Sequence, residues 1–263
     1  MAAAGLCRDA SAAAGDFRGS FKHEFVSSYM SSASGLRDTR PNMTDLLAWN
    51  LSLGDAGYLC GYFWAISALH DMQHRSHRPF FYDTEAIVQY GKALRFGDAV
   101  SLNTEAGPYF DVPFGYRNAH MKCWGSRVAQ RLDNPWVVPY WNGIWIIETT
   151  RRARIVVGLE KSFAFSGTFS ITPFAQTTWM DRRRFRRRFG SEPDRYTTGD
   201  GAFTTLFYGV RLGFKASENI RFIATAAMYD VVNSQARRIT RRSHDYSARC
   251  DWPIFRAGME FRF

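Results

Sequence analysis

The chain has 263 residues and a formal net charge of +10, and 46% of its residues are hydrophobic, 16% aromatic and 22% charged. No apolar run reaches the roughly 20 residues that a membrane-spanning helix requires, so a helical membrane protein is excluded. The four cysteines form no Cys-x-x-Cys pair, which argues against a zinc site.

The first 16 residues are rich in alanine and lack both a basic n-region and an apolar core of 7–15 residues. They therefore do not match a secretory signal peptide. We expect residues 1–16 to be a disordered N-terminal segment or a signal remnant. We expect residues 17–263 to form a single barrel domain.

Twelve segments have the period-two alternation of a strand that is apolar on one face. The segment 153–163 is the clearest, with Ile155 and Val157 on one face and Arg154 and Glu160 on the other. The twelve predicted strands are 21–31, 43–53, 58–70, 80–92, 99–110, 120–131, 136–148, 153–163, 168–180, 202–214, 219–232 and 252–263.

The connectors between these segments alternate in length. The long ones are 32–42, 71–79, 111–119, 181–201 and 233–251, whereas 149–152 is short. The short connectors that alternate with these, and that would lie at the opposite end of the strands, are 54–57, 93–98, 132–135, 164–167 and 215–218. Long loops on one side and tight turns on the other are typical of an outer-membrane barrel with its turns in the periplasm. We predict an all-β fold: a transmembrane antiparallel up-and-down β-barrel of about 12 strands in the bacterial outer membrane.

The last strand alternates strictly from Phe255 onward and ends on an aromatic residue. Its apolar positions would face lipid, and Phe261 and Phe263 would lie at the membrane interface of the strand that closes the barrel. An exported barrel of this kind needs the barrel-assembly machinery as a partner. The alternative is an amphipathic edge strand of a soluble all-β protein.

Four short stretches in the first half of the chain resemble the TorF-type putative porins of Gram-negative bacteria. They are 27–30 (SSYM), 62–66 (YFWAI), 85–91 (EAIVQYG) and 107–113 (GPYFDVP), in that order. The resemblance implies an outer-membrane barrel with a transport function. It assigns no functional residue.

If the apolar faces meet lipid, a set of charged side chains points into the lumen. Such charges would either set ion selectivity in an open pore or pair with one another as structural bridges that plug it. The predicted pore-lining residues are Glu85, Glu105, Arg154, Glu160, Arg211, Arg221, Arg256, Glu260 and Arg262.

Arginines are concentrated in two late connectors. On an exported barrel they would form an extracellular basic rim that meets the phosphates of lipopolysaccharide, and in a cytosolic protein they would suggest nucleic acid. A solvated loop is the plainer interpretation. The predicted rim comprises Arg182, Arg183, Arg184, Arg186, Arg187, Arg188, Arg237, Arg238, Arg241 and Arg242.

The residues in and beside the second long connector are weak candidates for a metal site or a catalytic site. His70, His74 and His77 are close in sequence, but the neighbouring arginines would repel a metal cation, so we expect no metal and no cofactor. His74 and Ser76 are the nearest approach to the His-Ser pair of a barrel lipid hydrolase. We expect no catalytic residues and no enzymatic activity.

The sequence therefore predicts an outer-membrane, porin-like channel for passive diffusion of ions or small solutes, leaning towards anions. Twelve strands tilted by about 40° give a backbone diameter of about 24 Å, which inward side chains reduce by about half. The alternatives are a non-conducting barrel that serves as an anchor, an adhesin or a lipopolysaccharide-binding protein, a barrel lipid hydrolase, and a soluble basic β-protein. We expect no nucleic-acid partner, and the oligomeric state stays open.

Overall fold

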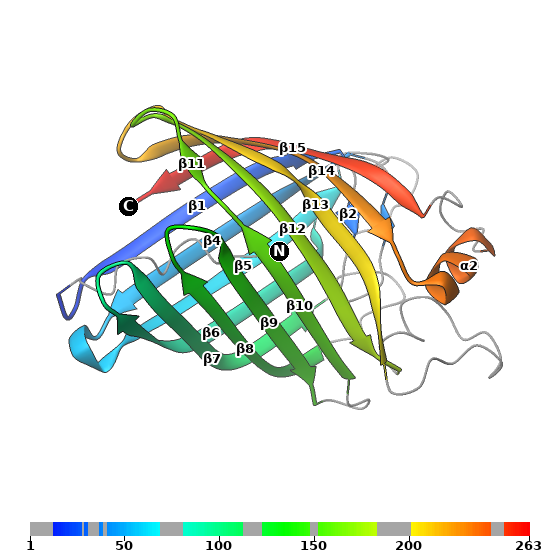
Figure 1. Ribbon diagram of the computed structural model, residues 1–263, viewed down its shortest axis with the longest axis horizontal. Helices are drawn as coiled ribbons and strands as arrows, with labels where there is room; N and C mark the ends of the chain where they lie inside the picture. Colours follow the sequence, from blue (N-terminus) through cyan, green and yellow to red (C-terminus); the bar gives the residue numbers. More distant parts are fainter. Residues whose placement is uncertain are drawn as a thin grey trace.

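The structure is a computed structural model that describes residues 13–27, 29–30, 37–38, 41–68, 81–112, 123–147, 152–182, 201–242 and 250–263. Twelve long strands form an antiparallel barrel (Figure 1). They are β1 (Phe17–Val26), β4 (Asn42–Ser52), β5 (Tyr58–Ala68), β6 (Phe81–Phe96), β7 (Val100–Val112), β8 (Cys123–Asp133), β9 (Val138–Ile146), β10 (Arg152–Glu160), β12 (Phe169–Asp181), β13 (Gly201–Lys215), β14 (Ile220–Val231) and β15 (Asp251–Arg262).

The smaller elements lie at the ends of these strands. β11 (Phe163–Ala164) adds to β12, and β2 (Tyr29–Met30) pairs with β3 (Arg37–Asp38) in a sheet of their own. A 3-10 turn, η1 (Gly54–Ala56), joins β4 to β5, and the helix α2 (Ser234–Arg242) follows β14. Within the described residues, no helix is long and apolar enough to cross a membrane.

Each of the twelve predicted segments forms a strand, so the predicted fold is confirmed. The sheet closes because β1 pairs with both β4 and β15, while β10 pairs with both β9 and β12. Closure leaves no unpaired edge along the twelve long strands, which is the condition for a sheet to cross a bilayer.

Two reciprocal main-chain hydrogen bonds and a ring–glycine contact join the ends of the first and last strands at the seam. The Gly19 N–H donates to the carbonyl of Phe263 at 2.7 Å, and the Phe263 N–H donates to the carbonyl of Gly19 at 3.0 Å. A Cβ on Gly19 would overlap the ring of Phe263. The aromatic side chain therefore lies directly over the bare backbone of β1.

The short turns form at one end of the barrel, because their residues accept tight backbone geometry. Gly97 has a φ of +72° in the turn between β6 and β7, which glycine adopts at no steric cost. The Asn134 side chain accepts hydrogen bonds from the N–H groups of Trp136 and Val137, at 2.9 and 3.0 Å, between β8 and β9. Figure 1 shows the C-terminus at this end and α2 at the other.

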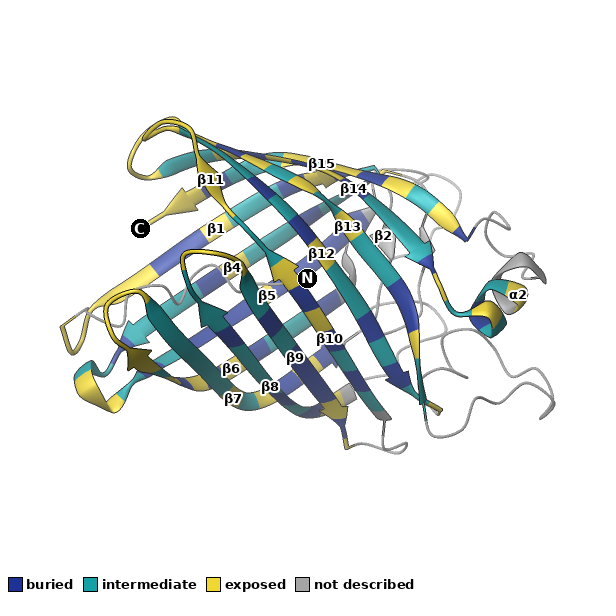
Figure 2. Ribbon diagram, viewed as in Figure 1, coloured by how far each residue is buried: buried dark blue, intermediate teal, exposed yellow. Residues whose placement is uncertain are grey.

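Exposed and buried residues alternate along most strands (Figure 2). In β10 the side chains of Val157 and Leu159 point outward and are exposed, whereas Arg154 is buried. The exposed set contains many large apolar residues from all around the barrel, including Phe63, Phe110, Val210 and Phe222. The outward face is thus the apolar surface that lipid requires.

Candidate functional site: the charged lumen

The nine charged residues that were predicted to line the pore lie at inward strand positions, and their role in a pore stays a prediction. Alternation along each strand places them on the side opposite the exposed apolar residues. Their partners are also inward residues, often from strands that are not neighbours in the sheet. The inward charges fall into two groups, one on β6–β10 and one on β13, β14, β15 and β1.

The first group is centred on Glu85 and lies in the half of the barrel near the long connectors. The Tyr62 hydroxyl donates a hydrogen bond to Oε1 of Glu85, and the Tyr109 hydroxyl donates to Oε2 at 3.3 Å. Tyr109 also reaches Asp111, which is buried. Two tyrosines thus satisfy a carboxylate without neutralising its charge.

Arg127 joins this group to Glu105. Its guanidinium donates to the side-chain oxygen of Gln89 and lies 3.6 Å from Oε2 of Glu105. The Tyr58 hydroxyl approaches the other oxygen of Glu105 at 3.4 Å. Arg154 is buried nearby, and its Nε has no hydrogen-bond partner among the described residues.

An ion-pair chain crosses from β8 through β10 to β13. Arg131 donates to Asp133 at 2.7 Å and to Oε1 of Glu160 at 2.8 Å. The other oxygen of Glu160 lies 3.8 Å from Nη1 of Arg211. β10 and β13 are separated by β12 in the sheet, so this contact spans the inner surface.

The second group is predominantly cationic. Arg211 on β13, Arg256 on β15 and Lys22 on β1 all lie on the inward face. Lys22 pairs with Glu24 at 2.7 Å, and Arg262 pairs with Glu260 at 3.3 Å. The side chains of Arg211 and Arg262 remain 36% and 50% exposed, so water reaches this wall of the lumen.

Opposite this wall, the lumen is filled at the level of the first group. A buried cluster of inward and neighbouring apolar side chains packs there; it comprises Ala48, Tyr62, Trp64, Ile66, Ile87, Tyr109, Ile144 and Ile146. Tyr109 has no exposed surface at all. These side chains occupy the inner surface along β4–β9, in the half near the long connectors.

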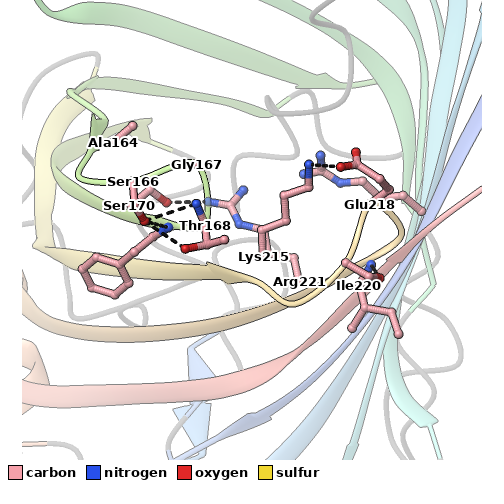
Figure 3. Close-up of a pocket in the computed structure, with 12 residues that line it drawn as sticks. Ala164, Ser166, Gly167, Thr168, Ser170, Lys215, Glu218, Ile220 and Arg221 are labelled. Atoms are coloured by element: carbon pink, nitrogen blue, oxygen red, sulfur yellow. Dashed lines mark hydrogen bonds and ion pairs between the residues drawn. The ribbon is translucent and has the colours of Figure 1, made fainter.

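The turn end of the lumen holds a cavity of about 170 Å³ (Figure 3). Lys215, Arg221 and Arg262 supply its cationic groups, and Ser170 accepts a hydrogen bond from Arg221 at 2.8 Å. Lys215 is paired with Glu218 at 2.7 Å. The cavity opens beside two short turns and continues the cationic wall to the mouth.

The predicted basic rim is described only in part. Arg182 is exposed directly after β12, and Arg237, Arg238, Arg241 and Arg242 belong to α2. Arg183, Arg184, Arg186, Arg187 and Arg188 lie outside the described residues, as do His70, His74, Ser76 and His77. The part of the chain that is described holds no cluster of three metal-ligating side chains.

The connector 233–251 was expected to be a loop, and the structure instead forms α2 within it. The Asn233 side chain accepts the N–H of Ala236 at 2.9 Å, as an N-cap does. Ala236 is buried against Met180, Val231 and Cys250, which fixes the helix to the ends of the strands. The capping residue and the helix-favouring Gln, Ala and Arg residues were available in the sequence.

Several inward charges were missed by the sequence analysis. They are Lys22, Glu24, Asp111, Arg127, Arg131 and Asp133. Lys22 and Glu24 alternate with Phe21 and Phe25, so the same period-two pattern would have identified them. In β8, Arg127, Arg131 and Asp133 lie at alternate positions on one face, so the same period would also have grouped them.

The barrel is similar to the solved structure of an outer-membrane channel from Pseudomonas putida F1, at 12% identity and a TM-score of 0.56, over 96% of this chain and 97% of that chain. Other similar structures are the KdgM porin, at 11% identity and a TM-score of 0.48 over 94% and 99% of the two chains, and the NanC porin, at 10% identity and a TM-score of 0.49 over 92% and 98%. No protein-family model and no curated protein matches the sequence. At these identities the likeness concerns the fold.

The fold is that of an outer-membrane β-barrel, and its apolar outward face suits contact with lipid. The resemblance to the TorF-type porins stays a prediction.

Proposed function

We propose that this protein is a narrow outer-membrane channel for passive diffusion of ions and small charged solutes. The observation that carries the proposal is the water-accessible cationic wall of the lumen, where Arg211 and Arg262 are 36% and 50% exposed. Charged side chains that face water inside a closed barrel are the feature by which pores select ions. A purely structural network would have no reason to leave these guanidinium groups in water.

The two groups of inward charges support a selectivity filter. Lys22, Arg211, Arg221, Arg256 and Arg262 outnumber Glu24 and Glu260 on one wall, whereas Glu85, Glu105, Asp111, Asp133 and Glu160 outnumber Arg127, Arg131 and Arg154 on the other. Opposed walls create a transverse field in a low-dielectric tube. Because the cationic wall is the accessible one, anions are the favoured solutes.

The filled level along β4–β9 limits the size of the solute. Tyr62, Trp64 and Tyr109 occupy the inner surface there and are buried. Only ions and small molecules fit past such side chains. The rival function, a non-conducting barrel that serves as an anchor or binds lipopolysaccharide, is favoured by the same occlusion.

Two partners belong to the proposal. The arginines of the rim, of which Arg182, Arg237 and Arg238 have described side chains, suit lipopolysaccharide phosphates because a guanidinium donates two parallel hydrogen bonds. Phe261 and Phe263 at the seam are the residues that we propose the barrel-assembly machinery recognises.

The test is ion conductance of the refolded full chain in a planar bilayer. We expect discrete channels with a reversal potential that favours chloride over potassium in a salt gradient. The double variant Arg211→Gln/Arg256→Gln should shift the reversal potential towards potassium, because it removes two charges from the accessible wall. The control Lys92→Gln removes one charge from an exposed outward position and should leave the reversal potential unchanged. A folded barrel with no conductance above that of the bare bilayer would establish the non-conducting alternative.

A further inference from the structure

A histidine–aspartate pair lies on the outward face of the barrel. His23 on β1 is the register partner of Asp45 on β4, and Nδ1 of the histidine lies 2.6 Å from Oδ1 of the aspartate. The two side chains are 44% and 25% exposed. Lys22 and Glu24, the sequence neighbours of His23, point into the lumen, so the pair points away from it.

The pair is surrounded by apolar residues along both strands. Phe21 pairs with Leu47 on one side of it, and Phe25 pairs with Met43 on the other. Phe21, Phe25 and Leu47 are all exposed on the outward surface. His23 and Asp45 therefore lie within the band that would otherwise meet lipid tails.

No comparable charged pair occurs on the outward face elsewhere in the described residues. The other charged residues at outward strand positions are Lys92, which lies alone within β6, and Asp181, Asp230 and Asp251, which lie at or next to a strand end. On the outward face of β7, β8 and β9, neutral polar groups hydrogen-bond to one another. The Gln130 side chain donates to Thr104 at 3.2 Å and accepts from Trp141 at 2.9 Å.

The His23–Asp45 pair keeps unused hydrogen-bonding capacity. In the described part of the chain, each residue has only the other as a partner, so one ring nitrogen and one carboxylate oxygen remain available. Hydrocarbon offers no group to bind them, which makes exposure to lipid costly. A protein surface that supplies one donor and one acceptor would remove this cost.

We propose that a second copy of this chain covers the outward surface of β15, β1, β4 and β5, forming a two-fold dimer in the membrane. A two-fold axis brings the same patch of both subunits together, so a residue and its partner exchange contacts. A donor–acceptor pair is self-complementary under that operation, because His23 of each copy can meet Asp45 of the other. Ala257 beside Phe25 is small and exposed, and small residues permit close approach of elements inside a membrane.

Site-specific photo-crosslinking of the full chain in membranes tests the interface. A photo-reactive amino acid replaces Leu47, beside the pair, or Val157 on β10, and both positions are 43% exposed. We expect irradiation to give a covalent dimer from position 47 and none from position 157. Dimers from both positions alike, from position 157 alone, or from neither would overturn the proposal.

Two double variants distinguish a dimer interface from a polar pair that faces lipid. With the photo-reactive group at position 47, His23→Leu/Asp45→Leu should reduce the crosslinked dimer by at least about tenfold. The control Thr104→Val/Gln130→Leu removes polar groups from the far side and should leave the dimer yield unchanged. If the His23–Asp45 pair faces lipid instead, the double Leu variant should raise the unfolding temperature of the barrel and leave crosslinking unaltered. That result would overturn the dimer proposal, whatever the conductance experiment shows.

Discussion

Inward glycines make room for large side chains that cross to them from the neighbouring strand. A Cβ on Gly158 would overlap the ring of Tyr140, and a Cβ on Gly91 would overlap the ring of Tyr58. Both tyrosines then reach further polar groups, since Tyr140 donates to Gln176 at 3.0 Å and Tyr58 to Glu105 at 3.4 Å. The missing side chain on one strand thus positions the ring of the next, which in turn holds the lumen network.

We therefore predict that Gly158→Ala destabilises the barrel by about 1–3 kcal/mol, because overpacking displaces the Tyr140 ring. The urea midpoint of unfolding in lipid vesicles measures the change. Gly167→Ala is the matched control, since nothing lies within 4 Å of its added Cβ. Equal midpoints for the two variants would show that the ring contact has no energetic importance.

Arg131 is the central residue of the ion pairs that link β8 to β10. Its side chain is 8% exposed and contacts both Asp133 and Glu160. We predict that Arg131→Met destabilises the barrel by about 3 kcal/mol, because it leaves a poorly solvated carboxylate without its main partner. The double variant Arg131→Met/Glu160→Gln should recover much of that loss.

Lys215→Met serves as the comparison in the same unfolding experiment. Its pair with Glu218 is exposed and is worth about 0–1 kcal/mol. An Arg131→Met effect as small as that of Lys215→Met would mean that water reaches Glu160 freely.

At the scale of elements, hairpins with short turns and a single long-range seam build the barrel. Eleven of the twelve neighbouring strand pairs in the ring are consecutive in the chain once the short strands β2, β3 and β11 are set aside, and only the β1–β15 pair joins the two ends. The local pairs follow from turn residues such as Gly97 and Asn134. The seam instead requires the whole chain, so its contacts decide whether the sheet closes.

Deletion of Phe263 should therefore reduce the folded yield several-fold, because it removes the ring over Gly19 and two main-chain hydrogen bonds of the seam. Gel mobility of the membrane fraction without boiling measures the folded form. Phe165→Ala removes an exposed aromatic from a short connector away from the seam and should leave the yield unchanged. The same yield for both would make the terminal ring incidental.

At the scale of the molecule, closure and charge distribution determine behaviour. The apolar outer face and the charged lumen leave no soluble state in which both are satisfied. We predict an all-β far-UV circular dichroism spectrum in detergent and a gel mobility that changes on heating. A monodisperse soluble monomer recovered without detergent would contradict the membrane barrel.

The arginines at the loop end should act over a distance set by salt. Replacing Arg182, Arg183, Arg184, Arg186, Arg187 and Arg188 with Gln should lower the chloride preference at low ionic strength and change it little at high ionic strength. The reason is that exposed charges are screened over about 8 Å at physiological salt. Reversal potentials at two salt concentrations provide the measurement, and identical values at low salt would show that the rim does not steer ions.

The sequence by itself determined the strands, their inward and outward faces and the end at which the turns lie. In β10 and β15 a period of two separates apolar from charged positions, and that period is a property of the backbone. The same period is the basis for the nine predicted pore-lining charges, from Glu85 to Arg262. It did not reveal α2, whose capping by Asn233 is a local signal inside a long connector.

Only the tertiary structure decided which inward charges meet. Glu160 contacts Arg131 on β8 and Arg211 on β13, and neither strand neighbours β10 in the sheet. Such contacts depend on the register of several strand pairs and on the curvature of the closed sheet, which no local pattern specifies. The pairing of His23 with Asp45 also depends on strand register, because register decides which residue of β4 lies opposite His23 on β1.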